Sequence, residues 1–151
     1  MPQASLSSFQ VGCALDFETS GYDPWLACSL GLARIEAGKI VKSYYTLLKP
    51  PSSQVLFTDV HGLTWEDLQA APTFLEVWPT IAVFLEGIDF FVAHNAPFDL
   101  KIYYATLKFF NLTPIVAPFL CTLKGARKLL SKLTSKSLAS VCRYFSINLN
   151  K

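Results

Sequence analysis

Apolar stretches of this chain are separated by short polar and turn segments, and their lengths predict strands in the amino-terminal third. The run Val11–Phe17 is typical of a buried strand, and Leu26–Ile35 and Ile40–Leu48 follow as two more. The turn residues Ala37-Gly38-Lys39 separate the last two and predict a hairpin. This third of the chain is therefore expected to form a three-stranded antiparallel meander.

Helices and strands are expected to alternate in the rest of the chain. Pro50–Ser53 is expected to be a loop, and Thr64 with Asp67 resembles a capping pair at the start of a helix. The later predicted elements are a helix from Pro72 to about Glu86 bent by Pro79, a strand over Ile88–Ala93, a helix over Ala96–Asn111, a strand over Ile115–Leu120, and helices around Leu123–Leu130 and Ser137–Phe145. The order predicts an α/β fold with a mixed central sheet and helices on both faces.

Length and composition predict one domain, residues 1–151, with a sizeable core, since 52% of the residues are hydrophobic and 16% are charged. The longest apolar region, Ile81–Ala93, contains Glu86 and Asp89, so no membrane span is expected. Met1–Gln10 lacks the basic and apolar regions of a signal peptide. The four cysteines lie far apart in apolar segments, which indicates buried thiols in a reducing, cytoplasmic compartment.

Charge is distributed unevenly along the chain, although the formal net charge is only +2. Residues 1–99 contain all 11 acids and four basic residues, a net charge of −7, whereas residues 100–151 contain nine basic residues and no acid, a net charge of +9. A solvated helix surface would explain part of this pattern. The absence of acids over so long a stretch favours a surface that phosphate groups approach.

Two acids close to the amino terminus form the first candidate site. In Asp16-Phe17-Glu18-Thr19, at the end of the first predicted strand, Asp16 and Glu18 project from the same face because side chains alternate along a strand. Adjacent carboxylates repel each other unless a cation lies between them or one is protonated. Their hard oxygen atoms suit Mg²⁺ or Mn²⁺. Two solvated acids at a strand end would have the same pattern, and these residues alone leave both interpretations open.

A second candidate run, His94-Asn95-Ala96-Pro97-Phe98-Asp99, begins where the Ile88–Ala93 strand ends and enters the next helix. Functional residues are frequent at this position in α/β sheets. Asp99 would lie in the first helical turn, where it could join Asp16 and Glu18 as a third carboxylate. Alternatively, it could only complement the helix dipole.

Together these runs resemble the DEDDh 3′–5′ exonucleases, the family of the proofreading epsilon subunit of bacterial DNA polymerase III and of RNase T. The similarity extends over nearly the whole chain. The matching segments are Asp16–Thr19, Val60–Thr64 with Ala71–Phe74, His94–Asp99, Cys121–Leu123 with Ala126-Arg127, and Ser137-Leu138 with Cys142 and Phe145. The resemblance implies a ribonuclease-H-like fold and two-metal hydrolysis of the terminal phosphodiester, with Mg²⁺ or Mn²⁺ as cofactor.

The same resemblance implies roles for individual residues. Asp16 would bridge the two metals, and Glu18 and Asp99 would complete their coordination. Thr19, His61 and Phe98 would line the pocket for the terminal nucleotide, with Phe98 packing against its base. Asn95 would support the site by hydrogen bonding. His61 and His94 could each instead be structural, and this alternative is the stronger one for His94.

The chain departs from the family pattern at the fourth motif. The family uses a histidine as general base, followed five residues later by a last metal-binding aspartate. Here no histidine follows His94 and no acid follows Asp99, and Tyr144 has no aspartate after it that could make a tyrosine-type site. The expectation is an exonuclease-like domain lacking its carboxy-terminal helix, either as a truncated form of a longer enzyme or as a naturally shortened member.

Two functions follow from this pattern. The first is a 3′–5′ exonuclease acting on single-stranded DNA or RNA ends, in proofreading or nucleic-acid processing. The second is a non-catalytic module that binds nucleic-acid ends or a DNA polymerase subunit, which the missing fourth motif favours. In the first case each missing group would cost about 10²–10⁴-fold in rate. No membrane partner is expected.

Overall fold

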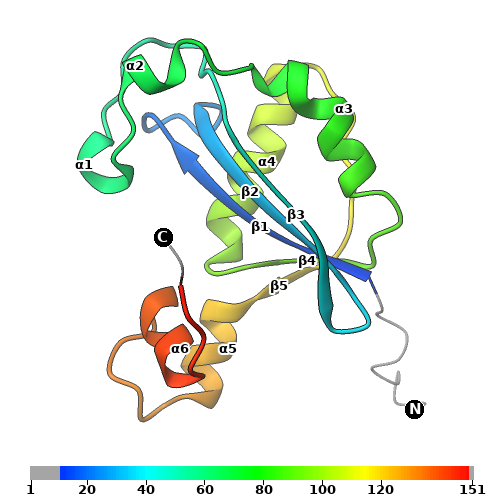
Figure 1. Ribbon diagram of the computed structural model, residues 1–151, viewed down its shortest axis with the longest axis vertical. Coiled ribbons are helices and arrows are strands. Elements are labelled where there is room, and N and C mark those ends of the chain that lie inside the picture. The colour runs from blue at the N-terminus through cyan, green and yellow to red at the C-terminus, as the bar shows by residue number, and fades with distance from the viewer. Residues whose placement is uncertain (1–10, 150–151) are drawn as a thin grey trace.

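The computed structural model describes residues 11–149 (Figure 1), so the segment for which no signal peptide was predicted lies outside the described residues. Five strands and six helices follow one another in these residues. They are β1 (Val11–Thr19), β2 (Ala27–Glu36), β3 (Lys39–Leu47), α1 (Thr58–His61), α2 (Trp65–Leu68), α3 (Phe74–Phe84), β4 (Phe90–Ala93), α4 (Ala96–Phe109), β5 (Phe119–Cys121), α5 (Thr122–Leu129) and α6 (Leu138–Tyr144).

The sheet is mixed, with the strand order β3-β2-β1-β4-β5. β1, β2 and β3 form the antiparallel meander that the sequence predicted, whereas β1–β4 and β4–β5 are parallel pairs. In Figure 1, α4 passes behind the strands and α3 lies at their upper right, whereas α5 and α6 lie at the lower left. The predicted α/β architecture with helices on both faces is confirmed.

The core lies between the sheet and the pair α3 and α4. Alternate residues of β1, Cys13, Leu15 and Phe17, are buried there against residues such as Ile81 and Ile102. Because side chains alternate along a strand, the acids at positions 16 and 18 project from the opposite face. The core therefore fixes which face of β1 presents the carboxylates.

Side-chain caps define where two of the helices begin. Thr64 and Asp67 form a capping box at α2, as the sequence predicted. At α3 the Thr73 N–H donates to Glu76 Oε2 at 2.7 Å, and the Glu76 N–H donates to Thr73 Oγ1 at 3.3 Å. This second capping box makes α3 shorter than expected, because Pro72 and Thr73 precede its first turn.

The strand expected over Ile115–Leu120 was largely wrong, since β5 spans Phe119–Cys121. Pro118 cannot donate a hydrogen bond, although its carbonyl accepts one from Phe91 at 2.8 Å. Ile115 is held instead by the Tyr103 hydroxyl, which accepts from its N–H at 3.1 Å and donates to its carbonyl at 3.0 Å. This pairing with a buried side chain of α4 replaces pairing in the sheet.

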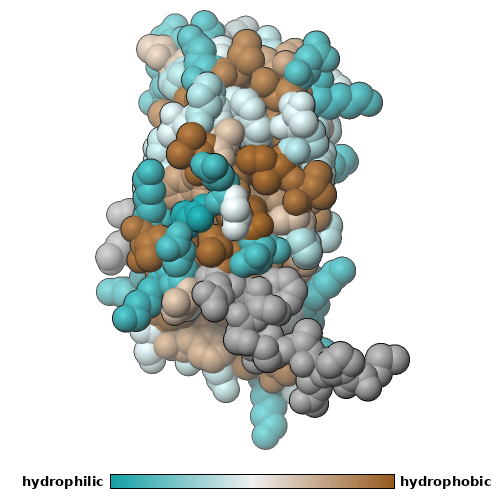
Figure 2. All heavy atoms as spheres, turned by 90° about the vertical axis from the view of Figure 1, so that its right-hand side faces the viewer, coloured by the Kyte–Doolittle hydropathy of each residue, from teal (hydrophilic) through white to brown (hydrophobic). Residues whose placement is uncertain are grey.

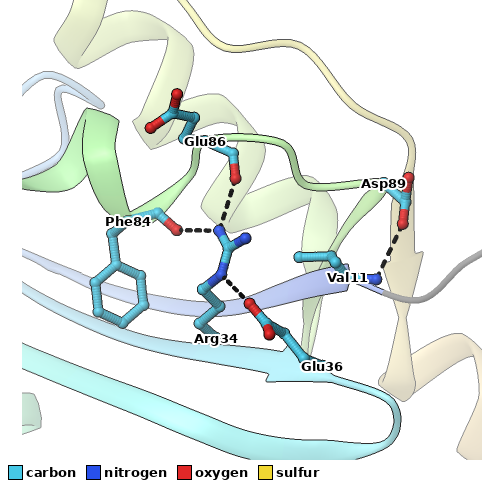
Figure 3. Close-up of polar contacts among 6 residues, drawn as sticks. All are labelled: Val11, Arg34, Glu36, Phe84, Glu86 and Asp89. Atoms are coloured by element: carbon cyan, nitrogen blue, oxygen red, sulfur yellow. Dashed lines mark hydrogen bonds and ion pairs between the residues drawn. The ribbon is translucent and has the colours of Figure 1, made fainter.

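One arginine ties the end of α3 to the meander (Figure 3). Arg34 Nη1 donates to the carbonyl oxygens of Phe84 at 2.9 Å and Glu86 at 2.7 Å, and its Nε contacts Glu36 at 2.8 Å. The last carbonyls of a helix have no partner within the helix, so the guanidinium satisfies acceptors that would otherwise need water. Figure 3 also shows Asp89 accepting the Val11 N–H at 2.9 Å.

The surface mixes apolar and polar side chains. Figure 2, which looks onto the side of α3 and of the 110–118 segment, shows apolar side chains gathered in the middle of this face; exposed apolar residues of these segments include Val83 and Val116.

No helix within residues 11–149 is long and apolar enough to cross a bilayer. The four cysteines are free, and Cys121 is only half-buried, in contrast to the prediction that all four are buried.

Candidate active site

The carboxyl-terminal half of β1 presents two acids on the face opposite the core. Asp16 is exposed and Glu18 is half-buried, whereas the neighbouring Leu15 and Phe17 are buried. Partial desolvation raises the pKa of Asp16. Desolvation and the charge of Asp16 raise the pKa of Glu18, while His61 acts in the opposite direction. The two carboxylates therefore lie within electrostatic reach of each other, as the D-x-E spacing predicted.

Asp99 comes to the same region from the first turn of α4. Its side chain is 2% exposed, and Oδ1 accepts the Phe17 N–H at 2.9 Å. Burial raises the pKa of Asp99 to about 7, the hydrogen bond from Phe17 opposes this shift, and the charges of Asp16 and Glu18 increase it. Asp99 is thus anchored to β1 itself, beyond a role at the helix dipole.

The anchor exists because β4 is short. β4 pairs with β1 only at Gly12, Cys13 and Ala14, so the Phe17 N–H lies past the end of this ladder. A buried N–H without a partner costs free energy, and the Asp99 carboxylate satisfies it. The Asp99 side chain therefore takes the place of a β4 partner at Phe17.

These three carboxylates suit a divalent cation by their chemistry. Mg²⁺ and Mn²⁺ prefer hard oxygen donors, and a bound cation would offset both the desolvation of these carboxylates and the repulsion that Asp16 exerts on Glu18 and Asp99. In residues 11–149, however, no three His, Cys, Asp or Glu side chains are already gathered as a metal cluster. Asp16, Glu18 and Asp99 are the residues that would hold a metal, with adjustment of their side chains.

His61 lies at the end of α1, a short helix that the sequence reading missed. Its Nδ1 accepts the Leu63 N–H at 3.1 Å, so Nε2 carries the proton and lies 3.1 Å from the carbonyl oxygen of Thr19. Gly62, with a φ of 78°, makes the left-handed turn that brings Leu63 back to the ring. Both ring nitrogens are therefore engaged within the protein, and His61 is held beside the buried Thr19.

Phe98 and Asn95 differ from each other in how well they match their expected roles. Phe98, the residue before Asp99 in α4, is 46% exposed, so its ring is accessible to a ligand. Asn95 is exposed and adopts a left-handed conformation, with a φ of 79°, at the start of α4. Its side chain makes no hydrogen bond to any other residue of the described range, so the expected support through such a bond is not found.

His94 connects the site to α5 and α6. Its Nδ1 lies 2.9 Å from Thr122 Oγ1, and its Nε2 lies 2.8 Å from the carbonyl oxygen of Lys136. Both nitrogens are engaged, which agrees with the structural alternative for this residue. Thr122 lies in the matching segment Cys121–Leu123, but no role was assigned to it from the sequence, although a polar residue immediately after the strand next to β4 was an available signal.

An apolar groove of about 390 Å³ lies between α5 and α6. The exposed apolar side chains on it are Leu129, Leu138, Phe145 and Ile147, and His94 lies at its edge. Most of the residues that line the groove are apolar. The groove therefore marks a side of α5 and α6 that the described residues leave open.

The family model for RNase T-type exonucleases matches residues 13–151. The PolC-type DNA polymerase III of Thermotoga maritima is 38% identical over 131 residues, which cover 84% of this chain but 9% of that protein. The DNA polymerase III subunit epsilon of Aquifex aeolicus is 31% identical over 142 residues, 90% of this chain and 68% of the subunit.

Among solved structures, the nuclease domain of 3′hExo, a DEDDh family member bound to rAMP, superposes with a TM-score of 0.75 at 14% identity. The superposition covers 96% of this chain and 83% of that domain, and it confirms the ribonuclease-H-like fold. The predicted resemblance is confirmed, although the chain spans only a small part of its PolC-type relatives. This chain belongs to the RNase T-type exonuclease family.

Proposed function

We propose that this chain acts on the 3′ ends of single-stranded nucleic acids as a 3′–5′ exonuclease dependent on Mg²⁺ or Mn²⁺. The observation that carries the proposal is the approach of Asp16, Glu18 and Asp99, with Asp99 fixed by the Phe17 N–H. Three carboxylates held close together repel one another, so without a cation they do not stabilise the folded state. This is the arrangement expected of residues that hold cations against a phosphodiester.

Divalent metal, when bound, would supply an activated water and charge neutralisation at the leaving oxygen. The residues of the chain would hold the metal and orient the terminal nucleotide. Asp99 stays in place through its hydrogen bond to β1, while Asp16 can adjust because its side chain is exposed. Phe98 and Thr19 would bound the terminal nucleotide, with His61 holding the backbone of Thr19.

The second candidate is a module that binds nucleic-acid ends or a polymerase subunit without cleaving. It is favoured by the absence of any histidine after His94 and any acid after Asp99. Neither His61 nor His94 offers a free ring nitrogen as a replacement base. The polymerase relatives make a polymerase the natural partner in this case.

We also propose that residues 1–151 form a single exonuclease-like domain whose functional unit includes a further helix. The support is the groove between α5 and α6, where Leu129, Phe145 and Ile147 remain exposed. A helix with an apolar stripe would cover these side chains and could bring the missing base and acid to the site. A longer form of the protein with higher activity than this one would support this proposal.

A labelled single-strand assay tests the enzymatic proposal. DNA and RNA oligonucleotides carrying a 5′ label are incubated with Mn²⁺ and the wild-type chain, Asp16→Asn or Glu66→Gln, the last an exposed acid of α2 as a matched control. Stepwise shortening from the 3′ end is expected with wild type and Glu66→Gln. Loss of about 3 kcal/mol of charge stabilisation would slow Asp16→Asn by roughly 10²-fold.

Other outcomes lead elsewhere. Metal-dependent binding without shortening supports the non-catalytic module, and equal rates for wild type and Asp16→Asn contradict the assignment of the site. A preference for DNA or RNA in the same assay identifies the substrate. Retention of a purified replicative polymerase by the chain would support the polymerase context.

A further inference from the structure

Helix α5 has two chemically different sides. Ala126 is buried and Leu130 is half-buried toward α6 and the sheet, whereas Lys124, Arg127 and Lys128 are exposed. Residues three and four apart in a helix lie on the same face, so these three cations form one continuous basic face. We define the basic face of α5 as Lys124, Arg127 and Lys128.

The basic face has no acidic partner. Within residues 11–149 the recorded ion pair is Arg34 with Glu36, which lies on the meander. No acid occurs after position 99, and the segment that follows α5 adds Lys132 and Arg143 as further exposed cations. Uncompensated positive charge of this density repels itself and attracts polyanions.

The basic face is tied to the candidate active site. Thr122 and Cys121, at the start of α5, contact His94 Nδ1 at 2.9 Å and the Ala96 N–H at 3.4 Å, in the run that leads to Asp99. The cations are therefore carried by a helix whose first turn is fixed to the same strand end as the third carboxylate.

We propose that the basic face of α5 binds the phosphate backbone of the single strand whose 3′ end lies at the carboxylates. This inference rests on the proposed function, and it adds where the strand runs. The partner is a polynucleotide because its closely spaced backbone phosphates match three cations gathered on one helical face. Lys124 and Lys128 lie one turn apart, about 6 Å along the axis of α5.

Salt dependence of binding provides the test. The affinity of a labelled oligothymidylate is measured by fluorescence anisotropy at salt concentrations from about 0.1 to about 1 M. EDTA in the buffer prevents cleavage. The variant is Lys124→Gln/Lys128→Gln. The matched control is Lys101→Gln/Lys108→Gln, which removes the same charge from exposed positions on α4, within the same acid-free part of the chain.

Each phosphate contact contributes a slope of about −0.7 to log K against log salt for single strands. The α5 variant should therefore lose about 1.4 from the slope, so that, relative to binding at 1 M salt, it binds about 25-fold more weakly than wild type at 0.1 M. The α4 variant should keep the wild-type slope. Thermal melting of both variants checks that each is folded.

Equal loss in both variants would show that only net charge matters, and would overturn the proposal. Unchanged binding in the α5 variant would overturn it as well. Failure of the exonuclease proposal would give a different result. The α5 variant would show the predicted loss of slope relative to wild type, but the wild type would not shorten the oligonucleotide with Mn²⁺. Shortening with an unchanged slope in the α5 variant would retain the exonuclease and exclude this path.

Discussion

The two parts of the molecule that meet at β4 are built differently. The buried cluster of apolar side chains draws its members from residues 13–107, in β1 to α4. Helices α5 and α6, in contrast, bury Ala126 and Cys142 and leave an apolar groove open. The carboxylates belong to the packed part, and most of the unpaired positive charge belongs to the open part.

The difference indicates a division of work. The three acids need fixed positions against their mutual repulsion, and a dense core supplies them. Cations that meet a flexible polyanion gain little from rigidity, so they can lie on a less stable unit. We therefore expect α5 and α6 to open locally at a lower free energy than the rest of the described structure.

Truncating the core should have the largest effect. Phe91 in β4 is fully buried, so Phe91→Ala should lower the free energy of unfolding by about 3–5 kcal/mol. Leu138→Ala in α6, where the side chain is 45% exposed, should cost less than about 1 kcal/mol. Urea denaturation measures both. Similar losses for the two variants would show that α6 belongs to the cooperative core.

The charge of Asp99 should destabilise the metal-free protein. Its pKa is about 7 in the folded state, above the ordinary value, so the folded state binds more protons between pH 4 and 7 and stability falls as the pH rises through this range. Asp99→Asn keeps an oxygen for the Phe17 N–H and removes the charge. At pH 8 it should be more stable than wild type by roughly 2–4 kcal/mol, measured by urea denaturation in EDTA.

Two comparisons test whether the charge of Asp99 causes this pH dependence. The control is Asp59→Asn, which removes an exposed acid of α1 that is not one of the three carboxylates. Mn²⁺ should stabilise wild type more than Asp99→Asn, because the variant lacks one of the carboxylates. An Asp99→Asn variant with the wild-type slope between pH 4 and 7 would contradict the assigned pKa.

Removing the His94 side chain should loosen the open part selectively. His94→Ala loses the contacts to Thr122 Oγ1 and to the Lys136 carbonyl, which should lower the local opening free energy of α5 and α6 by about 1–3 kcal/mol. Hydrogen exchange followed by mass spectrometry should show faster exchange in α5 and α6 while β1 and α4 remain protected. Faster exchange throughout the chain would mean that the two parts unfold together.

The smallest effect compares two similar helix caps. Thr73 caps α3 in the packed part, and Ser137 Oγ accepts the Ser140 N–H at 3.2 Å in α6. Thr73→Ala should lower the global free energy of unfolding by about 1 kcal/mol. Ser137→Ala should change exchange only within α6. A global loss in both variants would argue against independent opening.

Hydrophobic periodicity was sufficient for most of the fold. The meander, β4 and the longer helices were predicted within a few residues because their apolar patterns are long and regular. β5 was misplaced because Tyr103, distant in sequence, supplies the partner of Ile115. α1 was missed because four residues carry no period.

The candidate site was predicted in part for similar reasons. Alternation along a strand places Asp16 and Glu18 on one face, whatever the rest of the fold does. The contact of Asp99 with the Phe17 N–H joins positions 82 residues apart and depends on where β4 ends. No local sequence pattern indicates this long-range contact, and none indicates that both ring nitrogens of His61 are hydrogen-bonded within the protein.

The donor that holds Asp99 belongs to the backbone of Phe17, so replacing the Phe17 side chain cannot remove it. Only proline at this position would delete the N–H. Many sequences can therefore occupy the buried side of β1 while the third carboxylate keeps its position. The position of Asp99 is therefore set by the path of the main chain. Side chains on the buried side of β1 can be replaced while the geometry of the site is kept.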